Sequence, residues 1–146
     1  MDGMEAALEQ AKAAAAGGEV PVGAALYMGD QLIWADHNRV EGDHDPTAHA
    51  EMLCLRKGAE RLNRWRLSYC TLYVTLEPCP MCAGAIVMSR VGRCVFGAYD
   101  PEKGCMGSLY DFPADPALHS VTEWTAGERR EECSALLRDF FSRRRP

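Results

Sequence analysis

The sequence predicts an α/β protein, a three-layer α/β/α sandwich with a mixed, mostly five-stranded sheet. In the second half of the chain, β-branched and aromatic segments alternate with helical segments, which is typical of parallel strands whose connecting helices cover both faces of a sheet. A hairpin near the N-terminus adds an antiparallel pair, so the sheet is mixed. The length of 146 residues and the 47% hydrophobic content fit a single domain over residues 1–146 with a core of its own.

The first part of the chain predicts a helix followed by the hairpin. Met4 to Ala16 is rich in alanine, the strongest helix former. Val22 to Met28 and Gln31 to Asp36 are separated by Gly29-Asp30, which fits a tight turn between two strands. A polar loop, Asn38 to Asp43, follows the hairpin.

The remaining elements alternate in type. Asp45 suits an N-cap and Pro46 the first helical position, so we expect a helix from Asp45 to about Leu62. Thr125 to Glu128 fits a capping box that opens a last helix through Phe141. Between these two helices the expected elements are a strand from Thr71 to Leu76, a helix from Pro80 to Ser89, a strand from Arg93 to Tyr99 and a strand from Ser120 to Trp124.

Charge and cysteine content restrict the class of protein. The net charge of −5 argues against a generally basic surface for nucleic acid but allows a local basic patch. Met1 to Glu5 is acidic rather than a basic leader, and no long uncharged segment could cross a membrane, so we expect a cytoplasmic protein without a membrane partner. Five scattered cysteines are expected to be reduced, apolar fillers: Cys54, Cys70, Cys94, Cys105 and Cys133.

Two short stretches carry residues with metal chemistry. The first is His49-Ala50-Glu51, in the opening turns of the helix expected from Asp45. The second is Pro78-Cys79-Pro80-Met81-Cys82, where a strand gives way to a helix. With Cys79 as cap and Pro80 as first residue, the two thiols share one face near the positive end of the helix dipole, which favours thiolates and a bound cation.

The number of ligands indicates a catalytic metal. Structural zinc normally takes four protein ligands, whereas catalytic zinc takes three and keeps one position for water. We therefore predict one Zn²⁺ per chain, held by His49, Cys79 and Cys82, with Glu51 as the catalytic proton carrier. Residues two apart do not share a helix face, so His49 and Glu51 can converge only at a helix end that opens on a cavity.

Other interpretations of the cysteine pair have less support. A lone Cys-x-x-Cys also occurs in redox pairs and as half of a zinc knuckle, but a knuckle needs a second ligand pair, which the sequence lacks. His-x-Glu joined to Pro-Cys-x-x-Cys is the signature of zinc deaminases, which attack C4 of cytosine or C6 of adenine.

The chain also resembles the bacterial tRNA-specific adenosine deaminases of the cytidine-deaminase-like superfamily. The matching stretches are Glu19-Val20-Pro21-Val22-Gly23-Ala24, His44 to Glu51, Thr71 to Cys79, Met81-Cys82-Ala83-Gly84-Ala85, Phe96-Gly97-Ala98, Gly107-Ser108-Leu109 and Asp139-Phe140-Phe141. The resemblance implies a homodimer that converts the wobble adenosine of a tRNA anticodon stem-loop to inosine. It further implies that Asn38 hydrogen-bonds the target base, that Val20 and Leu76 line its pocket, and that Asp100 contacts flanking nucleotides.

Three rival functions stay open at this point. The first is a deaminase of free bases or nucleosides, such as guanine or cytosine, because those enzymes share Pro-Cys-Pro-Met-Cys. The second is a non-catalytic subunit that binds RNA, although such a subunit has no need of Glu51. The third is a structural zinc module, which the missing fourth ligand disfavours.

Two basic clusters could bind RNA. The first surrounds the end of the second long helix and comprises Arg56, Lys57, Arg61, Arg64 and Arg66. The second is Arg143, Arg144 and Arg145 at the C-terminus. Such clusters are usually solvated surface, but a terminal arm can also follow an RNA backbone, so the second is the better candidate for binding phosphates.

Overall fold

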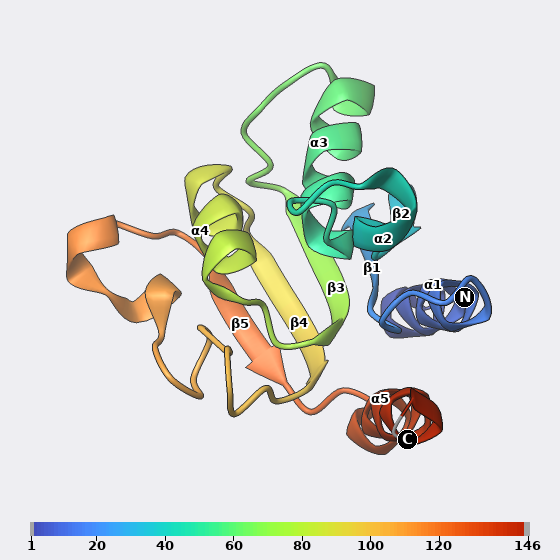
Figure 1. Cartoon of the computed structure of the whole chain (residues 1–146). Helices are drawn as coiled ribbons and strands as arrows, with labels where there is room; N and C mark the ends of the chain where they lie inside the picture. Colours follow the sequence, from blue (N-terminus) through green and yellow to red (C-terminus); the bar gives the residue numbers. More distant parts are fainter. Residues whose placement is uncertain (1, 145–146) are drawn as a thin grey trace.

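The computed structural model describes residues 2–144 and has a five-stranded mixed sheet at its centre (Figure 1). The strands lie in the order β2-β1-β3-β4-β5. β1 pairs antiparallel with β2 and β3, while β3–β4 and β4–β5 are parallel pairs, which confirms the predicted sheet. The strands are β1 (Gly23–Met28), β2 (Gln31–His37), β3 (Cys70–Leu76), β4 (Arg93–Ala98) and β5 (Glu123–Ala126).

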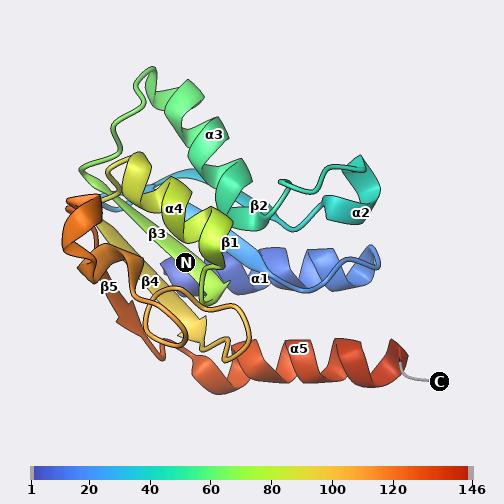
Figure 2. The ribbon, with the colours of Figure 1, turned by 60° about the vertical axis from the view of Figure 1, so that its left-hand side comes forward.

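Helices cover both faces of this sheet, as predicted (Figures 1 and 2). α1 (Gly3–Ala16) and α5 (Arg130–Arg144) lie on one face. α3 (Ala50–Leu62) and α4 (Pro80–Met88) lie on the other. One further turn of helix, α2 (Val40–Asp43), leads into α3, and two 3-10 turns, η1 (Phe112–Ala114) and η2 (Pro116–Leu118), precede β5.

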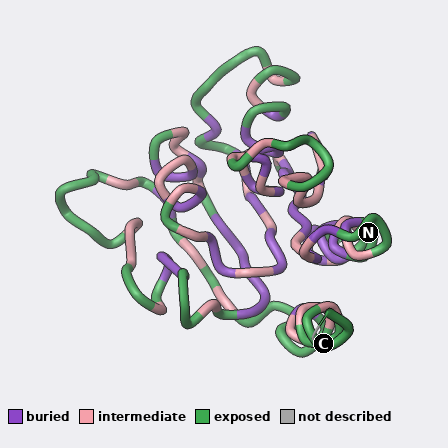
Figure 3. The backbone as a smooth tube through the Cα atoms, in the orientation of Figure 1, coloured by how far each residue is buried: buried purple, intermediate pink, exposed green. Residues whose placement is uncertain are grey.

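Each face of the sheet has its own apolar core, because alternate residues of a strand point to opposite sides. Leu72 and Val74 of β3 and Phe96 of β4 pack with α3 and α4. Val95 of β4 packs instead with α1 and with Cys133 of α5. The inner strands β1, β3 and β4 are accordingly mostly buried in Figure 3, whereas much of the connecting loops is exposed.

The helix expected from Asp45 begins five residues later, so that boundary was wrong. The carboxylate of Asp45 accepts hydrogen bonds from the backbone N–H and the hydroxyl of Thr47, both at 2.8 Å. The capping side chain therefore closes a local turn, and His49 becomes the N-cap of α3. The predicted polar loop from Asn38 to Asp43 likewise contains α2.

The start of the last helix was also placed too early. Thr125 and Ala126 pair with Val95 and Phe96 in the sheet, so they belong to β5 and cannot form the expected capping box. The strand therefore lies later than the predicted Ser120 to Trp124. The chain turns at Gly127, whose φ of 88° suits glycine, before α5 begins.

The expected state of the cysteines is confirmed. All seven are free, and the five outside the motif are buried. In the part of the chain that the structure describes, no helix combines the length and apolar character needed to cross a membrane.

Candidate active site

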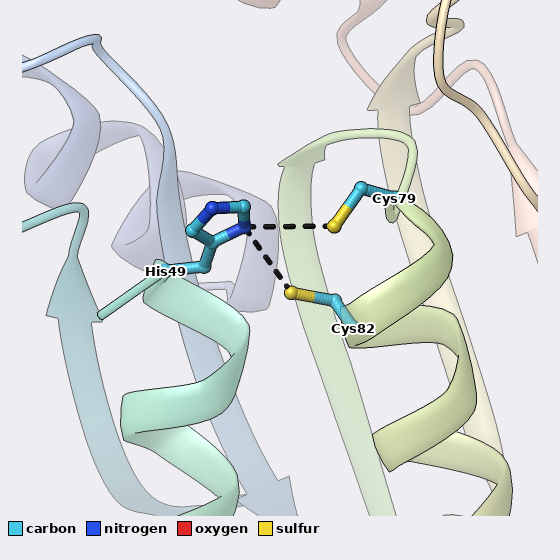
Figure 4. A group of neighbouring side chains, drawn as sticks. All are labelled: His49, Cys79 and Cys82. Carbon is cyan, nitrogen blue, oxygen red and sulfur yellow. Dashed lines mark hydrogen bonds between the residues drawn. The ribbon is translucent and has the colours of Figure 1, made fainter. Parts of the chain in front are cut away.

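Two helix N-termini meet at the site. β3 ends at Leu76, and after Glu77 and Pro78 the chain reaches Cys79, the N-cap of α4, with Pro80 in the first turn where its fixed φ suits a helix. His49 is the N-cap of the neighbouring α3. Figure 4 shows its imidazole pointing across the gap between the two helices toward both sulfurs. The positive ends of both helices thus favour anionic ligands here.

The spacing of the three donors fits a tetrahedral zinc ion. Nδ1 of His49 lies 3.6 Å from Sγ of Cys79 and 3.4 Å from Sγ of Cys82, and all three ligand atoms lie within 4.8 Å of one another. Zinc–sulfur and zinc–nitrogen bonds at the tetrahedral angle would separate N and S by about 3.6 Å. Within residues 2–144, no other group of three His, Cys, Asp or Glu side chains converges in this way.

The interaction between the two sulfurs shifts their pKa values in opposite directions. The hydrogen bond from Cys82 lowers the pKa of Cys79 to about 4, with a further contribution from His49. The same interaction, together with burial, raises the pKa of Cys82. The hydrogen bond to Cys79 also raises the pKa of His49. Soft, electron-rich sulfur beside imidazole is a donor set that suits zinc, which would stabilise the second thiolate as well.

Glu51 lies in the first turn of α3, beside the metal ligands. It is only 4% exposed, and this burial raises the pKa of its carboxyl to about 7, with the charge of Cys79 acting in the same direction. A group with a pKa near neutrality can both accept and donate a proton at physiological pH. The helix end thus brings His49 and Glu51 to one cavity, as their spacing required.

That cavity has a volume of about 460 Å³, within the range of small-ligand sites. The four residues expected to bind substrate, Val20, Asn38, Leu76 and Asp100, all line it. The side-chain oxygen of Asn38 accepts from the N–H of Val40 at 3.2 Å, which orients its amide. One carboxylate oxygen of Asp100 accepts from the N–H groups of the next turn, so this residue also has a local structural role.

Sequence reasoning missed several residues that border the cavity. Glu77 falls in the stretch Thr71 to Cys79 that resembles the family, but nothing in the sequence assigns it a role. Tyr99 directly precedes Asp100 and Lys103 follows it three residues later, and this proximity is the signal that could have identified them. Leu137 and Phe141 belong to α5, whose position against the cavity depends on tertiary packing. Phe141 lies in a stretch that matches the family, but that match does not indicate that α5 borders the cavity.

The described residues of the two basic clusters lie outside the cavity lining. In the first, Arg66 and Arg64 stack over the exposed rings of Trp65 and Tyr69. In the second, Arg143 pairs with Asp139 at 3.3 Å. Arg144 lies 4.2 Å from the ring centre of Phe140 and donates to the carbonyl of Gly18. Arg145 lies outside the described residues.

Comparison with known proteins places this site in a family. Residues 2–98, which include all three predicted ligands, match the family described as the cytidine and deoxycytidylate deaminase zinc-binding region. The tRNA-specific adenosine deaminase of Bacillus subtilis is 46% identical over 94% of this chain and 86% of its own. That of Haemophilus influenzae is 48% identical over 97% of this chain and 83% of its own.

Comparison with solved structures leads to the same family. One, from a study of A-to-I editing by tRNA:A34 deaminases at the wobble position of transfer RNA, has a TM-score of 0.89 and 40% identity, covering 92% of this chain and 97% of the other. The guanine deaminase from Nitrosomonas europaea has a TM-score of 0.80 and 30% identity, covering 95% of this chain and 82% of the other. The chain therefore belongs to the zinc-binding cytidine and deoxycytidylate deaminase family, in the group that contains the tRNA-specific adenosine deaminases.

Proposed function

We propose that this protein is a zinc-dependent enzyme that hydrolyses adenosine to inosine at the wobble position of a tRNA anticodon. The observation that carries the proposal is a three-donor metal centre beside a buried carboxyl, both facing one cavity. The near full-length similarity to tRNA-specific adenosine deaminases selects the substrate. Because tRNA is the substrate, the proposal also places the enzyme in the cytoplasm.

His49, Cys79 and Cys82 would hold the metal. When bound there, zinc lowers the pKa of a water molecule toward neutrality and so supplies the nucleophile for attack on C6 of the adenine ring. Three protein ligands leave a position for that water, whereas a structural zinc module would need a fourth. This count favours catalysis over the structural alternative.

Glu51 would move the protons. As a carboxylate it accepts one proton of the attacking water and delivers it to N1 of the ring. It then carries the second proton of the water to the amino group, which leaves as ammonia. The oxygen of the water thus ends on C6, one of its protons on N1 and the other on the departing ammonia. A carboxyl with a pKa of about 7 can both accept and release a proton near neutral pH, so neither transfer has a large free-energy cost.

The cavity walls would bind the base. Val20 and Leu76 offer apolar surface to its faces, Asn38 offers a hydrogen-bonding amide, and Asp100 lies where it can bind the flanking nucleotides. The anticodon loop presents unpaired bases, so turning one into a pocket costs less than extracting it from a duplex.

We further propose that the protein is a homodimer and that α4 contributes to the interface. Its sequence contains no charged residue, and Met88 at its end is 72% exposed. Apolar side chains on the nearby loops are also exposed, among them Leu109, Tyr110, Leu118 and Val121. Exposed apolar surface of this kind is typical of subunit interfaces.

The experiment that tests the function is nucleoside analysis of tRNA treated with the purified protein. We expect inosine at the wobble position and no product from the Glu51→Ala variant. Free guanine, cytosine and adenosine are tested in parallel, because the similarity to a guanine deaminase makes free-base deamination the second candidate. Turnover of a free base without inosine in tRNA would refute the proposal in favour of that candidate.

A further inference from the structure

A second buried carboxylate lines the cavity. Glu77, two residues before Cys79, is only 2% exposed. One of its oxygens accepts from the N–H of Asp100 at 3.0 Å and from the hydroxyl of Ser108. The other accepts from the N–H groups of Met106 and Ser108, both at 3.0 Å. Every one of these donors belongs to a single segment, residues 99–108, called the 99–108 loop below.

The loop is built closely around this carboxylate. A Cβ added at Gly104 would lie 2.2 Å from Cδ of Glu77, so only glycine permits the approach. Two backbone hydrogen bonds also hold the adjoining chain in place. The N–H of Cys105 donates to the carbonyl of Pro78 at 2.9 Å, and the N–H of Glu77 donates to the carbonyl of Ala98 at 2.8 Å. The strand end that leads to Cys79 and the 99–108 loop thus form one connected unit.

The same loop forms part of the cavity wall. Its residues Tyr99 to Lys103 border the cavity, and the N–H of Asp100 is itself one of the donors to Glu77. Only a carboxylate can satisfy this set of donors, since a glutamine side chain would turn an NH₂ group toward N–H and O–H donors. The two oxygens of Glu77 are both engaged by the loop, so its influence on substrate passes through the loop.

We propose that Glu77 is a positioning residue for RNA binding, holding the 99–108 loop preformed against the flanking nucleotides. The inference rests on the proposed function, because it names the part of that site which selects RNA. Glu77 neither moves protons nor holds the metal in this scheme. Its removal should weaken substrate binding while the chemical step and the zinc content stay nearly unchanged.

The test compares Glu77→Gln with the wild type on an anticodon stem-loop. We expect the KM to rise about ten- to hundredfold, because buried donors lose their acceptor, with kcat within about threefold of wild type and one zinc per chain by elemental analysis. Gly104→Ala should give the same pattern, because it forces the loop away while leaving the carboxylate in place. Ser108→Ala, which removes one hydrogen bond, should raise KM less.

Thr122→Val is the matched control. It deletes a buried hydroxyl that donates to the carbonyl of Val91, outside the cavity lining, and should leave KM unchanged. An unchanged KM in both Glu77→Gln and Gly104→Ala, or loss of zinc together with kcat, would overturn the inference. Should Glu77→Gln fail to fold, Gly104→Ala and Ser108→Ala decide by the same criteria.

The proposed function can fail separately. If the wild type forms no inosine, that function is wrong, and the dissociation constant of the stem-loop for the same variants still decides the role of Glu77. An absence of stem-loop binding by the wild type would overturn both.

Discussion

Glu51 and Cys79 lie within one small volume but depend on different features of the fold. The pKa of Glu51 is raised by its burial in the first turn of α3, whereas the pKa of Cys79 is lowered by a hydrogen bond from Cys82 at the start of α4. The protein thus keeps a protonatable carboxyl beside an anionic sulfur. In the proposed function the first property serves proton transfer and the second serves metal binding, so substitutions should separate the two roles.

Glu51→Gln is expected to retain one zinc per chain and to reduce inosine formation by a factor of about 10² to 10⁴, because the amide cannot carry a proton. Cys79→Ser should lose both the metal and the activity. Elemental analysis and nucleoside analysis of the same preparations measure the two effects. Substantial turnover by Glu51→Gln would contradict its proposed role, and a full zinc content in Cys79→Ser would remove that residue from the ligand set.

Among the elements, the sheet and most helices could be predicted because their signals are local. The turn residues Gly29-Asp30 marked the β1–β2 hairpin, the β-branched and aromatic run Thr71 to Leu76 marked β3, and Pro80 marked the start of α4. The start of α3 could not be predicted, because the carboxylate of Asp45 accepts a hydrogen bond from the N–H of Thr47 in a local turn and does not cap the helix. The grouping of His49, Cys79 and Cys82 was still predicted correctly, because that prediction depends on the spacing of the motif residues and not on where the helix begins. The register that places Thr125 in β5 is set by β4 and is invisible in the sequence.

The contribution of α5 to the cavity was likewise unpredictable. Phe141 is 48% exposed and borders the cavity, where its ring can stack on a base. We expect Phe141→Ala to raise the KM for an anticodon stem-loop roughly tenfold, since stacking on an aromatic side chain contributes about 1–3 kcal/mol per base. Zinc content should not change. Steady-state kinetics check this, and a KM equal to that of the wild type would mean that Phe141 does not touch the RNA.

At the scale of the whole molecule, the net charge of −5 means that the electrostatic part of any RNA affinity must come from local cations. Replacing Arg143, Arg144 and Arg145 by alanine should weaken stem-loop binding and flatten its salt dependence by roughly 0.7 in the log–log slope for each phosphate that is no longer neutralised. Arg144 already donates to Gly18, so the change should be smaller than three free arginines would give. Fluorescence anisotropy over a salt series measures it. An unchanged slope would mean that the three arginines do not neutralise RNA phosphates and are ordinary solvated surface.

The assembly can be tested through α4. Met88→Glu places a charge on the face that we assign to the dimer, and it should convert the protein to a monomer because a buried, unpaired charge is costly. Light scattering coupled to size-exclusion chromatography gives the mass directly. Leu32→Glu, at an exposed apolar side chain on the edge strand β2, is the control that should remain dimeric. A dimeric Met88→Glu protein would place the interface elsewhere.

The distribution of the seven thiols has a practical consequence. Six are buried, and Cys79 alone is partly open to solvent. A small alkylating reagent should therefore leave the loaded enzyme almost unmarked and, after chelation, label the folded chain first at Cys79. Mass spectrometry of the modified peptide would then report the fraction of the protein that lacks metal, without any assay of turnover. Labelling spread evenly over several cysteines would instead mean that chelation opens the core.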